Sequence, residues 1–138
     1  MAANTGAKAN YVLGVSIMDD THEEFIDLYN QLMQAGDAEF PVLFEELFLH
    51  TKHHFESENQ LMEESGFPAT SEHKAEHQRV INELKYFKSK VDCNKYSFAR
   101  FYIKDRIPLW FRLHLATMDS ALAFHLKSLE KNQVEKSA

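Results

Sequence analysis

Residues 54–77 read HFESENQLMEESGFPATSEHKAEH, and this stretch decides how the chain folds. His54 and Glu58 open it four residues apart, and His73 and His77 close it at the same spacing. Residues four apart project from one face of a helix. The glycine and proline between the pairs end one helix before the next begins. The stretch therefore predicts two neighbouring helices, each carrying a polar pair on one face.

Apolar residues recur every three or four positions in four segments of the chain, which is typical of amphipathic helices. We expect helices over about residues 20–34, from 39 or 41 to 65, from 70 or 71 to 91, and over 97–129. Pro108 falls inside the last segment and should kink the helix or split it. Short connections favour antiparallel neighbours, so the sequence predicts an all-α, up-down-up-down four-helix bundle.

The chain is long enough for one domain, and its composition suits a packed interior: 44% of the 138 residues are hydrophobic, including 11 Phe. Only 4 Gly and 3 Pro leave room for few turns, which favours long helices over many short strands. We expect an N-terminal arm over residues 1–17, the bundle over residues 18–130 and a C-terminal tail over residues 131–138.

Charge and hydropathy exclude several classes of protein. A formal net charge of −6 argues against nucleic-acid binding, which usually needs a basic patch. No run of 18 apolar residues predicts a membrane span, and the N-terminus lacks the apolar segment of a signal peptide. The single cysteine, Cys93, cannot form an internal disulfide and is interpreted as a half-buried small residue. We expect a cytoplasmic protein.

Seven potential metal ligands fall on the core-facing stripes of the four helices. They are His22, His54, Glu58, His73, His77, His114 and Asp119. Each pair alone is weak evidence, because a lone histidine on an apolar stripe is more often a hydrogen-bonded core residue. Together, buried polar side chains from all four helices that lacked a partner would destabilise a small core by roughly several kcal/mol in total. A bound metal is the partner that accounts for all seven.

The ligand types indicate which metal. Two six-coordinate ions offer twelve positions, and five imidazoles, two bridging carboxylates and one bridging oxygen fill all but one of them. A structural site is normally closed, so the open position suggests that a small ligand binds there. Mixed nitrogen and oxygen ligands in octahedral number favour iron over tetrahedral zinc.

His114 and Asp119 are five residues apart, about 140° around an ideal helix, where a four-residue pair is about 40° apart. Both can reach one site only if the side chains swing together or the turn widens into a π turn. The sequence predicts one of these two arrangements.

Four motifs then resemble the hemerythrin family, in its bacterial form. They are M-D-x-x-H ending at His22, H-F-x-x-E from His54, E-H-K-x-E-H ending at His77, and W-x-x-x-H-x-x-x-x-D from Trp110 to Asp119. The similarity extends from about Gly14 to Asp119, and no ligand position is missing. The resemblance implies a non-haem di-iron protein that binds O2 reversibly and acts as a carrier, a store or a local O2 supply.

The resemblance also implies ligand roles within an oxo- or hydroxo-bridged centre of two iron ions. His73, His77 and His114 would hold one iron, His22 and His54 the other, and Glu58 and Asp119 would bridge them. The iron with two histidines would keep the open position.

Three residues near His114, the histidine of the fourth predicted helix, should shape the ligand pocket. Trp110 would form a rigid wall, and Phe111 and Leu115 replace the Leu and Ile that the family commonly has. Phe111 either narrows the pocket or serves only packing. His50, one turn before His54, either orients a ligand or is a boundary histidine bonded elsewhere. His125 is interpreted as a surface histidine.

Three other functions remain open. The domain could sense O2 or redox state and signal to an attached or separate partner. It could be a di-iron peroxidase or oxidase, although its pocket offers no evident proton donor, so we expect no enzyme beyond a side activity. It could also be a zinc-stabilised bundle. A reductase partner fits the O2-binding and sensing functions. The sequence leaves the oligomeric state open.

Overall fold

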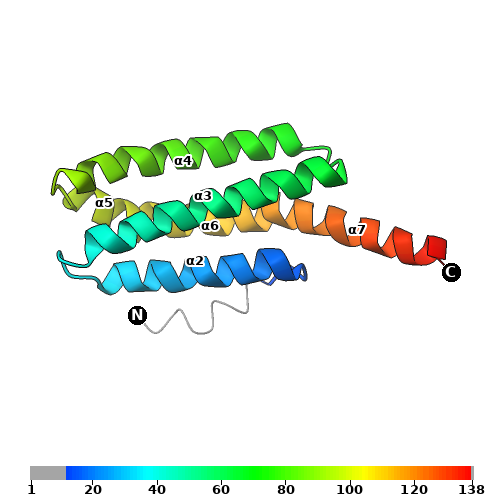
Figure 1. Cartoon of the computed structure of the whole chain (residues 1–138), viewed down its shortest axis with the longest axis horizontal. Helices are drawn as coiled ribbons and strands as arrows, with labels where there is room; N and C mark the ends of the chain where they lie inside the picture. The colour runs from blue at the N-terminus through cyan, green and yellow to red at the C-terminus, as the bar shows by residue number, and fades with distance from the viewer. Residues whose placement is uncertain (1–11, 138) are drawn as a thin grey trace.

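Four helical rods run alternately up and down the molecule and are joined by short turns (Figure 1). The structure is a computed structural model that describes residues 12–137. The first three rods are α2 (Ser16–Gln34), α3 (Phe40–Ser65) and α4 (Thr70–Asp92). The fourth is continuous and consists of α5 (Ser97–Phe101), η2 (Tyr102–Arg106), α6 (Ile107–His114), η3 (Leu115–Asp119) and α7 (Ser120–Ser137). The predicted all-α, antiparallel four-helix bundle is confirmed.

The first helix begins at Ser16, four residues earlier than predicted. The carboxylate of Asp19 accepts hydrogen bonds from the backbone N–H groups of Leu13 (2.7 Å) and Gly14 (3.1 Å), which orders the entry to the helix. Lys127 of α7 also donates to the Leu13 carbonyl at 2.6 Å. The end of the predicted N-terminal arm is therefore held against the bundle, and residues 1–11 lie outside the described part of the chain.

The turn between α3 and α4 follows the sequence prediction. Gly66 ends α3 with φ of 64°, a left-handed conformation that glycine adopts without strain, and Phe67 N–H closes the turn on the Met62 carbonyl at 3.0 Å. His125 bonds through Nε2 to the Ser65 carbonyl at 2.9 Å. This histidine is half-buried and caps α3, so its interpretation as a surface residue is corrected.

Pro108 does not break the fourth rod. The π-helical segment η2 comes directly before it, and the proline occupies the first turn of α6. Because proline lacks an N–H and crowds the preceding turn, the wider backbone spacing of η2 accommodates it. The rod also continues to Ser137, past the predicted end near residue 129 and through the predicted C-terminal tail.

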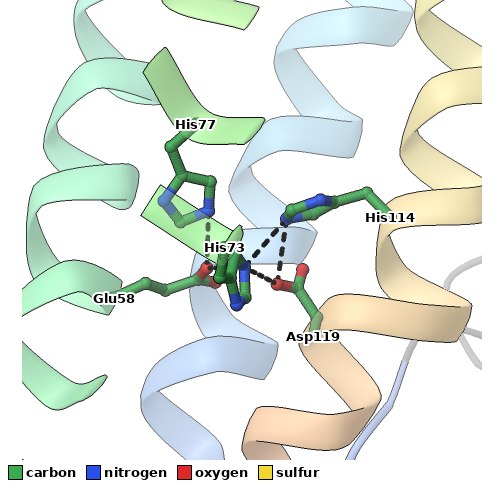
Figure 2. A group of neighbouring side chains, drawn as sticks. All are labelled: Glu58, His73, His77, His114 and Asp119. Atoms are coloured by element: carbon green, nitrogen blue, oxygen red, sulfur yellow. Dashed lines mark hydrogen bonds and ion pairs between the residues drawn. The ribbon is translucent and has the colours of Figure 1, made fainter. Parts of the chain in front are cut away.

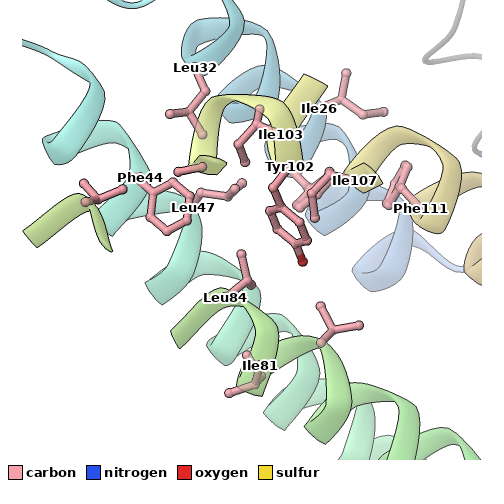
Figure 3. Packing of buried hydrophobic residues seen from close by; sticks show 14 of the residues in the cluster. Ile26, Leu32, Phe44, Leu47, Ile81, Leu84, Tyr102, Ile103, Ile107 and Phe111 are labelled. Atoms are coloured by element: carbon pink, nitrogen blue, oxygen red, sulfur yellow. The ribbon is translucent and has the colours of Figure 1, made fainter. Parts of the chain in front are cut away.

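Apolar side chains form two clusters at different heights in the bundle. The larger one includes Phe44 and Leu47 of α3, Leu84 of α4 and Ile103 of η2, all at most 1% exposed (Figure 3). The smaller one consists of the buried residues Met18, Met62, Leu122 and Ala123. Along α2, α3 and the fourth rod, the buried polar residues lie between positions of the larger cluster and positions of the smaller one, whereas α4 contributes buried apolar residues to the larger cluster only. The clusters thus enclose a polar layer in the middle of the bundle.

Two remaining expectations concern the surface. Cys93, at the end of α4, is exposed, which corrects its interpretation as half-buried, because α4 ends there and no element covers it. Across residues 12–137, none of the helices has the length and apolar character needed to cross a membrane.

Candidate metal centre

The polar layer contains all seven side chains that the sequence singled out. Each is at most 8% exposed. They come from every rod: His22 from α2, His54 and Glu58 from α3, His73 and His77 from α4, His114 from α6 and Asp119 from η3. The structure therefore brings together residues up to 97 positions apart in the sequence.

The seven side chains fall into two groups that share their carboxylates. One group consists of Glu58, His73, His77, His114 and Asp119, and Figure 2 shows these side chains pointing toward one another. The other group consists of His22, His54, Glu58 and Asp119. Within each group the candidate ligand atoms all lie within 4.8 Å of one another. Two adjacent cation sites sharing two carboxylates fit this arrangement.

Glu58 presents one oxygen to each group of histidines. Its Oε1 lies 3.2 Å from His77 Nε2 and 3.5 Å from His73 Nε2. Its Oε2 lies 2.5 Å from His54 Nε2 and 3.7 Å from His22 Nε2. This is the disposition that a bridging carboxylate requires, with one oxygen for each metal.

Asp119 repeats the same division. Its Oδ1 lies 3.1 Å from Nε2 of both His73 and His114, and its Oδ2 lies 3.1 Å from His22 Nε2. The two carboxylates thus stand between the same two groups of imidazoles.

The backbone of η3 explains how His114 and Asp119 reach one site. Residues 115–119 form a π turn, in which hydrogen bonds span five residues and side chains five apart come onto one face. Of the two predicted arrangements, the structure has the widened turn. A regular α-helix would have turned Asp119 well away from His114.

The polar contacts inside the layer fit a cation better than they fit one another. His77 Nδ1 donates to Asn59 Oδ1 at 2.8 Å, so in the neutral imidazole the Nε2 lone pair faces Glu58 Oε1. Two electron-rich atoms at 3.2 Å repel each other unless a proton or a metal lies between them. His73 Nε2 and His114 Nε2 likewise face each other at 3.2 Å. The residues present therefore fit a metal centre.

Unpaired atoms in the same layer support this fit. Glu58 Oε1, His77 Nε2 and Asp119 Oδ1 are buried without a hydrogen-bond partner among the described residues. Buried polar groups are nearly always paired, because an unpaired one costs about 1–3 kcal/mol. All three are among the atoms that face the space shared by the first group.

Without a metal, protons take its place in the electrostatics of the layer. Burial lowers the pKa of His22, but hydrogen bonds to Asp119 and Glu58 outweigh it and raise the pKa to about 9. The same causes raise the pKa of His73 to about 9. For His77, burial prevails and lowers the pKa, which favours the neutral imidazole that metals bind.

Both carboxylates are held in their charged forms. Burial alone would raise the pKa of Glu58, but the neighbouring histidines, His54 foremost, bring it well below its usual range. Burial and the Glu58 charge likewise raise the pKa of Asp119, yet hydrogen bonds with His114, His22 and His73 lower it overall. A pair of buried, ionised carboxylates is a strong attractant for divalent cations.

A small cavity of about 10 Å³ adjoins this polar layer, and this volume is about what a water-sized molecule occupies. His54, His114 and Asp119 border it together with apolar side chains. The cavity is lined by Phe25, Thr51, His54, Phe55, Trp110, Phe111, His114 and Asp119. Trp110 and Phe111 thus lie where the sequence placed them, whereas Leu115 is buried in the larger apolar cluster and is not among the lining residues.

Aromatic rings fix the orientations of the imidazoles. Phe55 stacks on His77 with ring centroids 3.9 Å apart and planes 7° apart. Trp110 stacks on His114 at 4.9 Å, and its indole N–H donates to Glu76 Oε2 at 3.1 Å. The orientation of the Trp110 indole is therefore held by both contacts, and its role as a wall of the ligand pocket stays a prediction.

His50 does not contact a candidate ligand through a hydrogen bond. Its Nε2 bonds to the Thr21 carbonyl at 3.2 Å, and its Nδ1 lies 3.7 Å from Glu24. It is therefore the boundary histidine of the two predicted alternatives, and it ties α3 to α2 beside His22.

Sequence reasoning missed three residues of the site: Asn59, Thr51 and the role of Phe55. Asn59 lies five positions after His54, and no periodic pattern in the sequence predicts that its side-chain amide contacts His77 of α4. Phe55 stood inside the H-F-x-x-E motif, so the motif carried a signal for it.

Comparisons with known proteins agree with this geometry. Residues 13–126 match the family model of the Hemerythrin HHE cation binding domain. The chain is 36% identical to the bacteriohemerythrin of Aquifex aeolicus (strain VF5) over 120 residues, which cover 83% of this chain and 91% of that protein. It is 27% identical to the bacteriohemerythrin of Ralstonia nicotianae over 126 residues, 91% of each chain.

Solved structures share the fold. A crystal structure of wild-type hemerythrin superposes with a TM-score of 0.71 at 22% sequence identity and covers 81% of this chain and 88% of that one. At this identity the likeness concerns the arrangement of the helices.

Proposed function

The chain belongs to the hemerythrin family, and from this premise we propose that it is a non-haem di-iron protein that binds O2 reversibly. One observation carries the proposal: Glu58 and Asp119 each direct one carboxylate oxygen toward each of the two groups of histidines. The family match over residues 13–126 also supports one bundle domain over residues 18–130.

In this proposal the two groups of side chains are the ligand sets of two iron ions. The first set would be His73, His77 and His114, the second His22 and His54, and Glu58 and Asp119 would be shared. Bound ferrous iron would supply the open coordination position and the electrons on which reversible O2 binding depends. The set with two histidines, His22 and His54, would leave that position open, because it would supply fewer nitrogen donors than the set with three.

The protein's own contribution is a small pocket with mostly apolar walls. Phe25, Phe55 and Phe111 form apolar walls beside the candidate ligands, and the cavity admits little more than a water-sized molecule. Low polarity keeps bulk water away from the site, which protects a bound ligand from displacement. Carriage, storage, local supply and sensing of O2 all begin with this binding step.

The lining of the cavity favours binding over enzymatic turnover. Among the described residues that line it, Thr51 is the only polar side chain that is not a candidate metal ligand or part of the indole wall. A peroxidase would need an acid group there to protonate its substrate. We therefore propose an O2-binding protein rather than an enzyme.

One experiment tests this proposal directly. The purified protein is analysed for metals, and its absorption spectrum is recorded with O2 and after deoxygenation. We expect two iron ions per chain and an absorption band that disappears when O2 is removed and returns when it is readmitted. Two zinc ions with a featureless spectrum would overturn the proposal.

A further inference from the structure

Thr51 is a buried hydroxyl residue that the metal centre does not use. It lies on α3 one turn before His54, is 2% exposed and lines the small cavity. Its Oγ1 has no hydrogen-bond partner among the residues that the structure describes. An unpaired buried hydroxyl is unfavourable, so its retention at this place needs a reason.

Other hydroxyls in these helices satisfy themselves locally. Thr21 donates to the Ile17 carbonyl at 2.7 Å, Thr117 to the Leu113 carbonyl at 2.6 Å, and Ser128 to the Phe124 carbonyl at 2.9 Å. Such bonds to the carbonyl four residues earlier are the usual solution for a hydroxyl inside a helix. Thr51 departs from this pattern and leaves its hydroxyl available.

Among the described residues that line the cavity, Thr51 is the only one with a hydroxyl group. Apolar rings of Phe25, Phe55 and Phe111 supply the rest of the wall beyond the candidate ligands and Trp110. The Trp110 indole N–H is already bonded to Glu76. A guest molecule with lone pairs therefore meets one free donor outside the ligand set, and that donor is Thr51.

We propose that the Thr51 hydroxyl donates a hydrogen bond to the small ligand that occupies this cavity and thereby slows its release. The ligand class is a diatomic or triatomic molecule with an exposed acceptor atom, such as O2 or azide. This inference rests on the proposed function, because it assigns a residue that retains the guest of the same site. Thr51 acts on the ligand and holds no metal.

Two substitutions separate the hydroxyl from the space that it fills. Thr51→Val keeps the shape and removes the hydroxyl, whereas Thr51→Ser keeps the hydroxyl and removes the methyl group. In the iron-loaded protein we expect Thr51→Val to weaken azide binding about tenfold, the effect of losing one hydrogen bond, mainly through faster dissociation. Thr51→Ser should remain within about twofold of the parent protein. Ser128→Ala, at a hydroxyl of α7 that already donates to the Phe124 carbonyl, is the control and should change nothing.

Azide binding that is equal in Thr51→Val and the parent protein would overturn the inference, and so would equal losses in Thr51→Val and Thr51→Ser. The iron content and the O2-dependent band of the parent protein report separately on the proposed function. A measurement without metal tests the inference independently. The metal-free Thr51→Val protein should unfold at a higher temperature than the metal-free parent, because an unpaired hydroxyl has been removed. A lower unfolding temperature would show that the hydroxyl is bonded within the protein, and would overturn the inference.

Discussion

Asn59 of α3 holds His77 of α4 in one tautomer, through a 2.8 Å hydrogen bond from the imidazole Nδ1 to the amide Oδ1. The proton on Nδ1 leaves Nε2 as the nitrogen that faces Glu58 and the interior of the site. Phe55 stacks on the same imidazole, so both its tautomer and its ring plane are set before any metal arrives. Such outer contacts are a large part of metal affinity in proteins.

Replacing Asn59 by Ala should therefore lower the affinity for metal about 10- to 100-fold without removing a ligand. Competition with a chelator of known affinity measures this change. Gln60→Ala is the matched control, because Gln60 is an exposed neighbouring amide whose side chain donates to Glu64 on the same helix. Equal affinities of the Asn59 and Gln60 variants would contradict the role of Asn59.

Glu58→Gln should reduce the iron content to one ion per chain or fewer. The amide keeps the size of the side chain but lacks the charge and the second oxygen donor that the two groups of histidines share. Metal analysis after reconstitution measures the outcome. Glu56→Gln, at an exposed carboxylate two residues earlier, should still hold two ions. Full iron content in Glu58→Gln would refute a bridging role.

Phe111→Leu should let small ligands enter the site several times faster. The Phe111 ring stacks on Phe25 at 4.8 Å, meets His22 edge-on at 5.7 Å and closes one side of the cavity. A shorter side chain enlarges this cavity at a loss of about 1 kcal/mol in the free energy of unfolding. Stopped-flow mixing with O2 measures the association rate, and Phe124→Leu, at a ring that is 73% exposed, is the control. An unchanged rate would leave Phe111 with a packing role alone.

The metal-free protein should lose stability as pH rises from 6.5 to 9. Hydrogen bonds to Asp119 and Glu58 raise the pKa of His22 and His73 from 6.5 to about 9. A raised pKa means that the protonated form stabilises the fold, fully below pH 6.5, and that this contribution disappears as pH passes about 9. Thermal unfolding of chelator-treated protein across this range measures the effect. An unfolding temperature that rises over the same interval would contradict these pKa values.

Metal binding should show the opposite dependence on pH. Two protonated histidines must each release a proton before they can bind a cation, so affinity rises with pH over the window in which the metal-free fold weakens. Calorimetric titration in two buffers of different ionisation enthalpy counts the protons released. Near pH 7 we expect about two per chain, one each from His22 and His73.

Much of this molecule could be predicted from local pattern. The spacing of His54 with Glu58 and of His73 with His77 placed both pairs on inward faces, and Gly66 marked the end of α3. These features depend on helical geometry within a few residues, which a sequence displays openly.

The features that escaped prediction depend on contacts between distant residues. The first helix begins at Ser16, where Asp19 binds the backbone N–H groups of the preceding Leu13 and Gly14, and α7 continues past residue 129. His125 is half-buried because α3 ends beside it, and Cys93 is exposed at the position that follows the last residue of α4. Asn59 and Thr51 gained their places from the packing of α3 against its neighbours, which no periodicity reveals.

The wide turn at residues 115–119 has a consequence for anyone who redesigns this protein. Converting these five residues to a regular α-helix without a deletion would strengthen the local backbone hydrogen bonding, yet it would rotate everything that follows by about 100° relative to what precedes it. Leu122 and Ala123 would then leave the apolar cluster they share with Met18 and Met62. The π turn thus lets the same rod supply both the polar layer and the smaller apolar cluster, and a regular α-helix at this place would remove its residues from one of them.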